Sequence, residues 1–319
     1  MLSQAVSPMQ DKLPVAVIGV GYLGRFHALI YSRLPQVRLI GVVDSDLERA
    51  REVAREAGCP AFNTLEDIAD QVQAVSVVVP TSSHLVVAEP LLKRGVHMLL
   101  EKPIAATRAE GERIVQLAQE GRAILQIGHL ERFNAGVMAL AEHIDDPRFI
   151  EAQRMGEFVP RATDVDVVAD LMIHDIDIIL SLVKAELRAV SAIGTPVLTD
   201  QVDIANARLE FANGAVANVV ASRVSDRRTR RIRVFQERKY LSLDFLEQTL
   251  DVAYPRLTSG ANRPEIVRER LQVESVRPLD REIEAFVTCV NNQRPPLVDG
   301  RVGLKALEVA LKVRDCMRR

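Results

Sequence analysis

Three glycines stand at fixed spacing between a run of apolar, mostly β-branched residues and a segment that is compatible with a helix. The run Val15–Ile18 leads directly into the loop 19–24, and residues 25–32 contain neither proline nor glycine. In this order the first glycine permits a tight turn, the second leaves room for a pyrophosphate, and the third lets the helix approach the strand. N–H groups at the start of the helix would face the phosphates. The loop therefore predicts a dinucleotide site, whose expected binding residues are Gly19, Gly21, Tyr22, Leu23 and Gly24.

Apolar runs alternate with amphipathic stretches through the first part of the chain. This alternation is typical of parallel βαβ units, in which each helix crosses over the sheet. It predicts an α/β fold that begins with a Rossmann domain, a doubly wound parallel sheet over residues 1–128. The predicted strands are Val15–Ile18, Val37–Val43, Ala74–Val79, Val96–Leu100 and Ala123–Ile127, and the predicted helices include Asp46–Ala57, His84–Arg94 and Arg108–Gln119.

The pattern changes after Gly128. Strand-like runs then follow one another with turns such as Asn213-Gly214 between them, which is typical of antiparallel pairing. Residues 129–319 are therefore predicted to form a substrate-binding and oligomerisation domain, an α/β domain built on an open, mostly antiparallel sheet. The predicted strands are Leu187–Ile193, Ile204–Phe211, Val216–Ser222, Ile232–Gln236 and Tyr240–Leu243. The predicted helices are Asn134–His143, Asp170–Val183, Leu279–Asn292 and Gly303–Met317, of which the last two are candidates for docking on the first domain.

Charge and cysteine content exclude several classes of partner. The net charge is −2 and the cations are dispersed except in one stretch, so nucleic acid is not an expected partner. Residues 1–12 lack the apolar centre of a signal peptide, and no segment has the apolar length of a membrane span. The three cysteines show neither disulfide nor zinc spacing. We therefore expect a cytoplasmic protein that contacts no membrane and holds no metal.

A carboxylate follows the second predicted strand. Asp44 lies 20 residues beyond Gly24, where an acidic side chain accepts hydrogen bonds from the adenosine ribose hydroxyls. It would repel the 2′-phosphate of NADP, and Ser45-Asp46 offers no cation to receive that phosphate. Asp44 therefore favours NAD as the cofactor. The alternative for Asp44 is a helix N-cap, which Ser45 or Asp46 could fill equally well.

Two further motifs carry chemistry. The tripeptide Glu101-Lys102-Pro103 follows a predicted strand at the carboxyl edge of the sheet, where open α/β sheets bind ligands, and the segment Asp170–Asp177 contains an Asp-x-x-x-His pattern. Together with the glycine loop and the segment Pro80–His84, these motifs resemble the Gfo/Idh/MocA oxidoreductase family over nearly the whole chain. The resemblance implies NAD(P)-linked oxidation of a sugar or cyclitol hydroxyl. It also implies a homodimer or homotetramer, because the open sheet of the second domain often forms the oligomer interface.

Three segments carry a finer resemblance, namely Gly128–Asn134, Asp164–Val168 and Val202–Arg208. They are similar to the bacterial members of the family that oxidise the 3-hydroxyl of UDP-N-acetylglucosamine to a 3-keto sugar nucleotide, a precursor for lipid A synthesis. The resemblance thus implies a nucleotide-sugar substrate. A dehydrogenase of another sugar, nucleotide sugar or cyclitol is the alternative.

Oxidation of a secondary alcohol moves a hydride to the nicotinamide and a proton to a basic group within hydrogen-bond reach. Lys102 and His174 are the candidates, because histidine titrates near neutral pH and lysine stabilises a developing alkoxide even when charged. Asp170 lies four residues before His174 and would share its helix face. The resemblance implies that Lys102 and His174 face the reacting carbon and that Asp170 holds substrate or orients the imidazole. We favour His174 as the general base, and the reverse assignment stays open.

The remaining candidates are less distinctive. Pro80, Thr81 and His84 follow a strand beside the expected cofactor groove, although a turn and a helix N-cap explain them almost as well. Glu101 is a candidate for contact with the nicotinamide ribose or carboxamide, or for a partner of Lys102. The candidate substrate contacts are Lys102, Arg132, Asn134, Arg161, Asp170 and His174.

The arginine-rich stretch 223–233 suits a diphosphate, but its alternation with Ile232 and Val234 favours a strand with a solvated face.

Two interpretations from other classes compete with the dehydrogenase. A regulator that senses NAD without turnover is the first alternative, and the presence of both Lys102 and His174 argues against it. Glycosidase chemistry with a transiently reduced NAD is the second.

Overall fold

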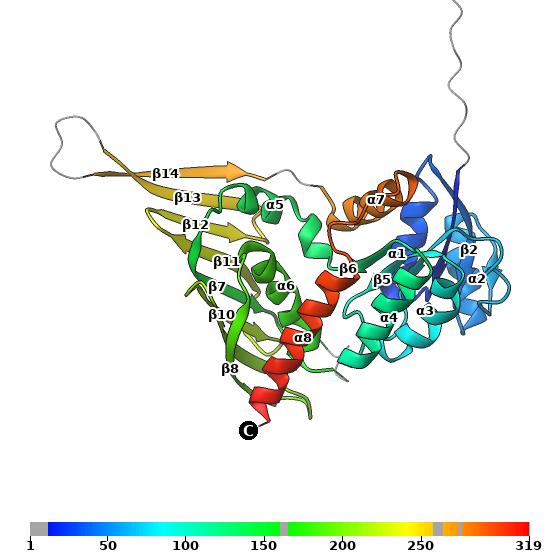
Figure 1. Cartoon of the computed structure of the whole chain (residues 1–319), viewed down its shortest axis with the longest axis horizontal. Coiled ribbons are helices and arrows are strands. Elements are labelled where there is room, and N and C mark those ends of the chain that lie inside the picture. The colour runs from blue at the N-terminus through cyan, green and yellow to red at the C-terminus, as the bar shows by residue number, and fades with distance from the viewer. Residues whose placement is uncertain (1–11, 160–164, 258–263, 274–275, 319) are drawn as a thin grey trace, which may run out of the picture. The chain divides into compact units, whose positions relative to one another are not determined.

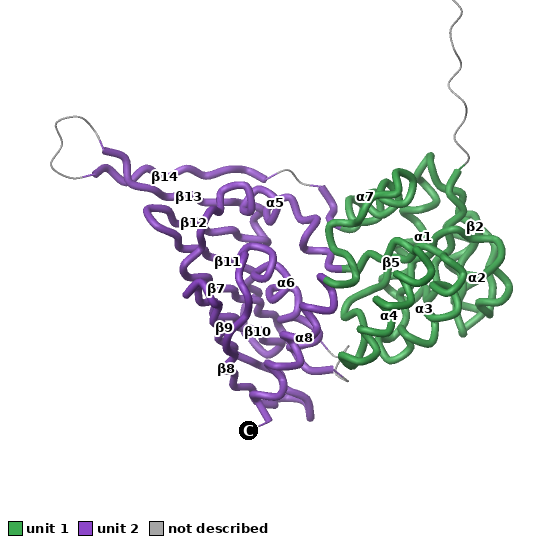
Figure 2. Tube along the Cα trace, in the orientation of Figure 1, with its two compact units in different colours: residues 1–128, 279–301 green, residues 129–278, 302–319 purple. Residues whose placement is uncertain are grey.

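The computed structural model describes residues 12–159, 165–257, 264–273 and 276–318. It divides into two compact units (Figure 2), one formed by residues 1–128 and 279–301 and the other by residues 129–278 and 302–319. Each unit has its own buried apolar core. Helix α7 (Pro278–Asn291) contributes Phe286 to the first core, whereas α8 (Gly300–Met317) contributes Ala310 to the second.

The first unit is built on a six-stranded parallel sheet with the order β3-β2-β1-β4-β5-β6. This confirms the predicted doubly wound sheet. The chain order reverses between β1 and β4, and open α/β sheets bind ligands beyond the carboxyl ends of their strands at such a point. The strands are β1 (Leu13–Ile18), β2 (Val37–Val43), β3 (Ala61–Phe62), β4 (Ala74–Val77), β5 (His97–Glu101) and β6 (Leu125–Gly128). The helices are α1 (Tyr22–Tyr31), α2 (Leu47–Ala57), the short 3-10 turn η1 (Thr81–Ser83), α3 (His84–Lys93) and α4 (Arg108–Glu120).

Local sequence explains these elements. Val15, Ala16 and Val17 of β1 are fully buried, because helices cover both faces of a parallel sheet. Helix α2 begins where Asp46 accepts a hydrogen bond from the backbone N–H of Arg49, and it ends at Gly58 in the left-handed conformation. Strand β3 was not predicted because it contains two residues.

The second unit is built on an eight-stranded sheet with the order β14-β13-β12-β11-β7-β10-β9-β8. The pair of β7 and β10 is parallel and the other pairs are antiparallel, which confirms the mostly antiparallel sheet. Strands β7, β13 and β14 were not predicted, and in β14 the reason is its charged sequence, since it is a largely exposed edge strand. The strands are β7 (Pro147–Met155), β8 (Leu187–Thr195), β9 (Ile204–Phe211), β10 (Val216–Ser222), β11 (Thr229–Gln236), β12 (Lys239–Asp244), β13 (Thr249–Arg256) and β14 (Glu265–Gln272).

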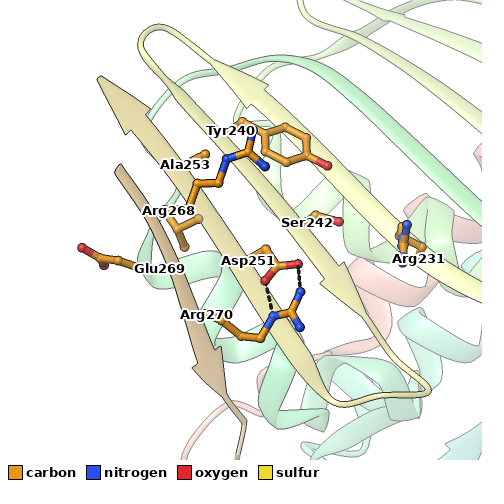
Figure 3. A pocket seen from close by; sticks show the side chains of 9 residues that line it. Arg231, Tyr240, Ser242, Asp251, Ala253, Arg268, Glu269 and Arg270 are labelled. Carbon is orange, nitrogen blue, oxygen red and sulfur yellow. Dashed lines mark hydrogen bonds and ion pairs between the residues drawn. The ribbon is translucent and has the colours of Figure 1, made fainter. Parts of the chain in front are cut away.

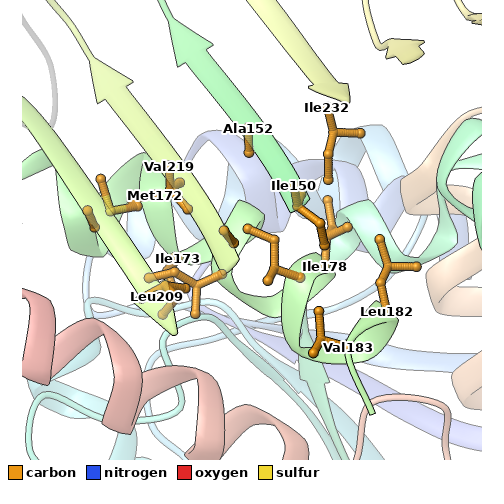
Figure 4. Packing of buried hydrophobic residues seen from close by; sticks show 14 of the residues in the cluster. Ile150, Ala152, Met172, Ile173, Ile178, Leu182, Val183, Leu209, Val219 and Ile232 are labelled. Carbon is orange, nitrogen blue, oxygen red and sulfur yellow. The ribbon is translucent and has the colours of Figure 1, made fainter. Parts of the chain in front are cut away.

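Helices α5 (Ala135–Glu142) and α6 (Ile173–Leu182) cover one face of this sheet (Figure 1). Ile173 and Ile178 of α6 pack against apolar residues of the central strands, such as Ile150 and Val219 (Figure 4). The other face carries alternating polar and aromatic side chains, among them the ring cluster Phe149, Phe235 and Tyr240. The sheet is thus apolar on the helix side and mixed on the other.

The predicted helix Asp170–Val183 is wrong in its first turn. Residues Val168–Met172 form a π-helical turn, η3, and the α-helix begins at Ile173. Asp166 accepts hydrogen bonds from the backbone N–H groups of Val168 and Ala169, which ties the start of this turn. Wider turns of this kind occur frequently at functional sites.

Candidate functional site

The glycine loop has the geometry that a dinucleotide site requires. Gly19 has a φ of +82°, and a Cβ there would lie 2.5 Å from the carbonyl oxygen of Val78. A Cβ on Gly24 would lie 1.9 Å from the carbonyl oxygen of Gly19. By contrast, nothing lies within 4 Å of a Cβ built on Gly21. The protein's own packing therefore requires Gly19 and Gly24, whereas the space beside Gly21 fits a bound pyrophosphate.

The start of α1 also suits an anion. Its N-cap is Gly21, and no side chain caps it. The N–H groups of the first turn therefore have no side-chain acceptor at this cap, and the helix dipole favours negative charge there. Tyr22, a predicted contact, is 76% exposed at this end of the helix, and Leu23 is partly exposed.

Asp44 joins the end of β2 to the glycine loop. Its Oδ2 accepts a hydrogen bond of 2.9 Å from the backbone N–H of Val20, and its Oδ1 accepts one from Asp46. Arg49 donates to both carboxylate oxygens, at 3.1 and 2.8 Å. Burial alone would raise the pKa of Asp44, but Arg49 and the two backbone donors lower it. Asp44 is thus a carboxylate at neutral pH, and Asp46 is the N-cap of α2.

Arg49 corrects one argument made from the sequence. Ser45-Asp46 offers no cation, but Arg49 supplies one to Asp44 from the first turn of α2. Its side chain is 45% exposed, so the ion pair borders solvent. The sequence did not predict this ion pair, because Arg49, five residues after Asp44, also fits the exposed face of an amphipathic helix.

The residues after β4 differ in exposure. Pro80 is exposed and Thr81 is partly buried, so both are accessible at the end of the strand next to β1. His84 is fully buried, and its two ring nitrogens lie 3.1 Å from the carbonyl oxygen of Val79 and 3.3 Å from that of Ile104. Burial lowers the pKa of His84 despite these contacts. His84 therefore links two loops at the carboxyl edge of the sheet, which favours a structural role.

The end of β5 carries Glu101 and Lys102. The carboxylate of Glu101 accepts a hydrogen bond of 3.2 Å from the backbone N–H of Lys102. A Cβ on Gly128 at the end of β6 would lie 2.8 Å from Glu101 Oε1, so this glycine makes room for the carboxylate. Lys102 is partly buried. This places the carboxylate of Glu101 against the backbone of Lys102.

Asp170 and His174 lie in the second unit. Asp170 belongs to the π-helical turn η3 and His174 to the first turn of α6, and both are partly buried. The next carboxylate, Asp175, is fully engaged by Arg154 of β7, whose guanidinium donates two hydrogen bonds of 2.9 Å to it. Asp177 pairs with Arg132 at 3.4 Å. Asp175 and Asp177 therefore each have an arginine partner, Arg154 for the first and Arg132 for the second.

Arg154 is a residue that the sequence did not identify. It is 4% exposed and also donates to Glu131 at 2.8 Å, so one buried cation joins β7, α6 and the 3-10 turn η2 (Leu130–Phe133). Burial alone would lower the pKa of Arg154, but Asp175 and Glu131 raise it. Glu131 and Asp175 belong to segments that the sequence analysis identified. Arg154 was not identified as their common partner, because it lies in β7, a strand that the alternation of apolar and polar residues did not predict.

Two predicted substrate contacts have structural partners in the second unit. Asn134 is 5% exposed, accepts a hydrogen bond from the backbone N–H of Gly136 as the N-cap of α5, and donates to Glu131. Arg132 is largely buried against Asp177. Arg161 lies outside the described residues. Asn134 and Arg132 therefore have roles that do not need a substrate.

Two arginines of the arginine-rich stretch form ion pairs on the uncovered face of the sheet. Arg231 pairs with Asp244 at 3.0 Å and Arg233 with Glu151 at 2.8 Å, which supports the solvated-face interpretation. A hollow on this face is lined by Arg231, Tyr240 and the ion pair of Arg270 with Asp251 (Figure 3). None of the predicted catalytic residues lines it.

Comparisons with known proteins place the chain in a family. Residues 13–129 match the Gfo/Idh/MocA oxidoreductase family with its NAD-binding Rossmann fold, and residues 126–242 match a C-terminal domain of the same family. The chain belongs to the Gfo/Idh/MocA family. It is an oxidoreductase, and its first unit carries the NAD-binding Rossmann fold.

Two curated relatives illustrate the range of this family. UDP-N-acetylglucosamine 3-dehydrogenase from Acidithiobacillus ferrooxidans is 41% identical over 299 residues, which cover 93% of this chain and 95% of that protein. The NAD-dependent scyllo-inositol 2-dehydrogenase from Bacillus subtilis is 30% identical over 68% of this chain and 69% of its own. Both are named as dehydrogenases, one of a nucleotide sugar and one of an inositol.

Solved structures agree with the sequence comparison. A structure of the Acidithiobacillus ferrooxidans enzyme superposes with a TM-score of 0.91 at 40% identity, covering 96% of this chain and 98% of that one. Levoglucosan dehydrogenase in complex with NADH and levoglucosan shares the fold, with a TM-score of 0.84 at 18% identity over 97% and 98% of the two chains.

None of the described helices has both the length and the hydropathy of a membrane-crossing helix. Within the same residues, no group of three or more His, Cys, Asp or Glu side chains suits a metal ion.

Proposed function

We propose that this chain oxidises the 3-hydroxyl of UDP-N-acetylglucosamine with NAD and releases the 3-keto sugar nucleotide. The observation that carries the proposal is the 41% identity to the 3-dehydrogenase from Acidithiobacillus ferrooxidans, which extends over nearly the full length of both chains. The finer motifs that resemble lipid A precursor enzymes support the same substrate. The product would be available to an amination step.

The proposed chemistry assigns a role to three side chains. NAD, when bound, accepts the hydride from the sugar carbon. His174 takes the proton of the 3-hydroxyl as general base, and Lys102 donates a hydrogen bond to that oxygen and stabilises the developing alkoxide. Asp170, which precedes His174 by four residues, orients the imidazole or holds the sugar. The support is the position of Lys102 at the carboxyl end of β5 and the π-helical turn before His174.

For the cofactor we propose NAD rather than NADP. Asp44 is ionised, and its carboxylate would repel a 2′-phosphate at the end of β2. The guanidinium of Arg49 is held in an ion pair with Asp44, so Arg49 is not available to bind a 2′-phosphate. The pyrophosphate would lie against Gly21 and the start of α1, and Tyr22, Leu23, Pro80 and Thr81 are proposed to line the cofactor.

We also propose that the enzyme is a cytoplasmic homodimer or homotetramer that associates through the uncovered face of its eight-stranded sheet. The aromatic cluster Phe149, Phe235 and Tyr240 on that face supports the association. The three cysteines are free in the structure, which fits a reducing compartment.

A cyclitol dehydrogenase is the second candidate, because the scyllo-inositol 2-dehydrogenase from Bacillus subtilis is 30% identical over 68% of the chain. One assay separates the two functions. The purified protein is incubated with NAD and a panel of nucleotide sugars, free sugars and inositols, while NADH absorbance and product mass are followed. We expect NADH with UDP-N-acetylglucosamine and a product lighter by two hydrogens. NADH with an inositol alone would establish the second candidate, and NAD binding without turnover of any compound would refute both.

Two substitutions test the assigned roles. Lys102→Ala and His174→Ala should each lower kcat by about two to four orders of magnitude while the protein stays folded. Lys93→Ala and His143→Ala remove the same residue types elsewhere and should leave kcat within a factor of two. Wild-type kcat in either test variant would remove that residue from the mechanism.

A further inference from the structure

A second group of polar side chains lies inside the first unit. His27 and Tyr31 of α1 and Ser76 of β4 are fully buried, at 0% exposure, although the surrounding core consists mostly of Val, Leu, Ile and Ala. Burial of polar groups costs free energy unless they find hydrogen-bond partners. A core that served packing alone would not need three such groups at one place. Their contacts are therefore informative.

The three side chains form one continuous chain of contacts that ends at Glu101. Tyr31 Oη lies 2.8 Å from Ser76 Oγ, and Ser76 Oγ lies 3.1 Å from His27 Nδ1. The other ring nitrogen, His27 Nε2, lies 3.6 Å from Glu101 Oε1. Glu101 Oε2 accepts the backbone N–H of Lys102. Residues from α1, β4 and β5 thus connect the interior of the unit to the proposed catalytic lysine.

One arrangement of protons satisfies both hydrogen bonds among Tyr31, Ser76 and His27. Burial raises the pKa of Tyr31, so its hydroxyl keeps its proton at neutral pH and donates to Ser76. When Ser76 donates to His27 Nδ1, the ring proton of His27 is on Nε2. Among the described residues, His27 Nε2 has no hydrogen-bond partner within 3.5 Å, and its nearest carboxylate oxygen is Glu101 Oε1 at 3.6 Å, so the two groups interact electrostatically. Both hydrogen bonds therefore run in one direction, from Tyr31 through Ser76 to His27, and the ring N–H of His27 is left for the nearby carboxylate of Glu101.

The carboxylate of Glu101 is also confined from the other side. Its side chain is 12% exposed, and the missing Cβ of Gly128 provides the space that Oε1 occupies. Because a charged group in a confined space depends on its few polar neighbours, His27 has a strong influence on where this carboxylate lies.

We propose that His27 is a positioning residue of the active site: together with Ser76 and Tyr31 it fixes the carboxylate of Glu101, which holds the peptide N–H of Lys102. The inference rests on the proposed function through the role of Lys102. A displacement of about 1 Å at a catalytic group lowers turnover by about 100-fold. Cofactor affinity should change little, because Gly19, Gly21 and Asp44 are not members of this chain of contacts.

Two substitutions of His27 separate positioning from packing. The amide nitrogen of glutamine can take the place of Nε2, so His27→Gln keeps a donor toward Glu101. Asparagine reaches the place of Nδ1, so His27→Asn keeps a partner for Ser76 and loses that donor. Ser76→Ala is a third, smaller change that removes one hydroxyl from the middle of the chain of contacts. The matched control is His97→Gln, which removes a contact of a partly buried histidine, the acceptor for the N–H of Ile124, from the same unit.

Three quantities are measured for each variant: kcat, the Kd for NADH from its fluorescence, and the thermal midpoint. We expect kcat to fall at least tenfold in His27→Asn and Ser76→Ala, with the Kd for NADH within threefold of wild type. His27→Gln should restore kcat to within threefold, and His97→Gln should lose stability without losing kcat. Equal kcat in His27→Asn and His27→Gln would overturn the proposal. So would a wild-type kcat in Ser76→Ala, which also decides the matter if His27→Asn does not fold.

A readout without substrate separates this proposal from the proposed function. The acetylation rate of Lys102 by acetic anhydride is measured by mass spectrometry, with the exposed Lys93 as internal reference. We expect this rate to change at least threefold in Ser76→Ala and to stay at the wild-type value in His97→Gln. An unchanged rate in Ser76→Ala would overturn the positioning role. Failure of the wild-type enzyme to oxidise UDP-N-acetylglucosamine would refute the proposed function and leave this measurement intact.

Discussion

Replacement of Arg154 by methionine would leave two buried carboxylates without their common cation. Arg154 donates two hydrogen bonds to Asp175 and one to Glu131, and its guanidinium carbon lies 5.6 Å from the centre of the Phe245 ring. Removal of one partner from a buried ion pair costs about 3–5 kcal/mol, because the remaining charge stays desolvated. We therefore expect Arg154→Met to lower the free energy of unfolding by about 4 kcal/mol. For a unit of this size that equals a fall of about 8–16 °C in Tm.

The loss should depend on pH with a defined sign. Burial raises the pKa of Asp175 above its usual 3.8, and Arg154 acts to lower it. A carboxyl whose pKa is raised by folding binds protons more tightly in the folded state, so its contribution to stability falls as pH rises through that raised pKa. Without Arg154 the pKa of Asp175 rises further. The deficit of Arg154→Met should therefore be largest near pH 7.5 and shrink toward pH 5.

Calorimetry at both pH values measures this deficit, and circular dichroism supports it because the chain contains no tryptophan for fluorescence. Arg208→Met is the matched control. Arg208 lies in the same sheet and pairs with Glu210, but both side chains are 46% exposed, so its loss should cost less than about 1 kcal/mol. The reasoning would be refuted if Arg154→Met and Arg208→Met had equal stability, or if the deficit grew toward pH 5.

Three further predictions follow from the site and its surroundings. Gly21→Ala should keep Tm within about 3 °C of the wild type, because the added Cβ meets no atom within 4 Å. It should weaken NADH binding at least tenfold, as measured by fluorescence, because the Cβ occupies the space proposed for the pyrophosphate. Gly24→Ala should instead fail to reach the wild-type fold by circular dichroism, since its Cβ would overlap the carbonyl oxygen of Gly19. Asp44→Ser should raise the ratio of kcat/KM for NADP to that for NAD by at least tenfold, because the repulsive charge is lost and Arg49 is released, and an unchanged ratio would contradict the role of Asp44. Asp203 accepts hydrogen bonds from three backbone N–H groups, which lower its pKa. The ionised carboxylate therefore stabilises the fold above about pH 4, and this stabilisation is lost as pH falls through the lowered pKa. Asp203→Asn should lower the free energy of unfolding at pH 7 by about 1–3 kcal/mol in urea titrations, and a stability equal to that of the wild type would contradict this prediction.

The parts of the fold that depend on local sequence were predictable. Val37–Val43 and Ile204–Phe211 coincide with observed strands, because a run of β-branched or alternating residues is sufficient to mark a buried strand. Strand β7 was missed although it lies at the centre of the second sheet, since its charged residues obscure the alternation. The π-helical turn before His174 was missed because side-chain periodicity does not distinguish it from an α-helical turn.

The sequence by itself determined the glycine loop and the carboxylate after β2, because their chemistry lies in short segments with fixed spacing. It also supplied the family motifs around Lys102 and His174. Only the tertiary structure decided that Arg154 joins Glu131 to Asp175 and that His27 lies between Ser76 and Glu101. These partners are more than 20 residues apart in the chain, so the order of the strands in each sheet brings them together. No local pattern encodes such a meeting, because each residue alone is compatible with an ordinary position on a helix or strand.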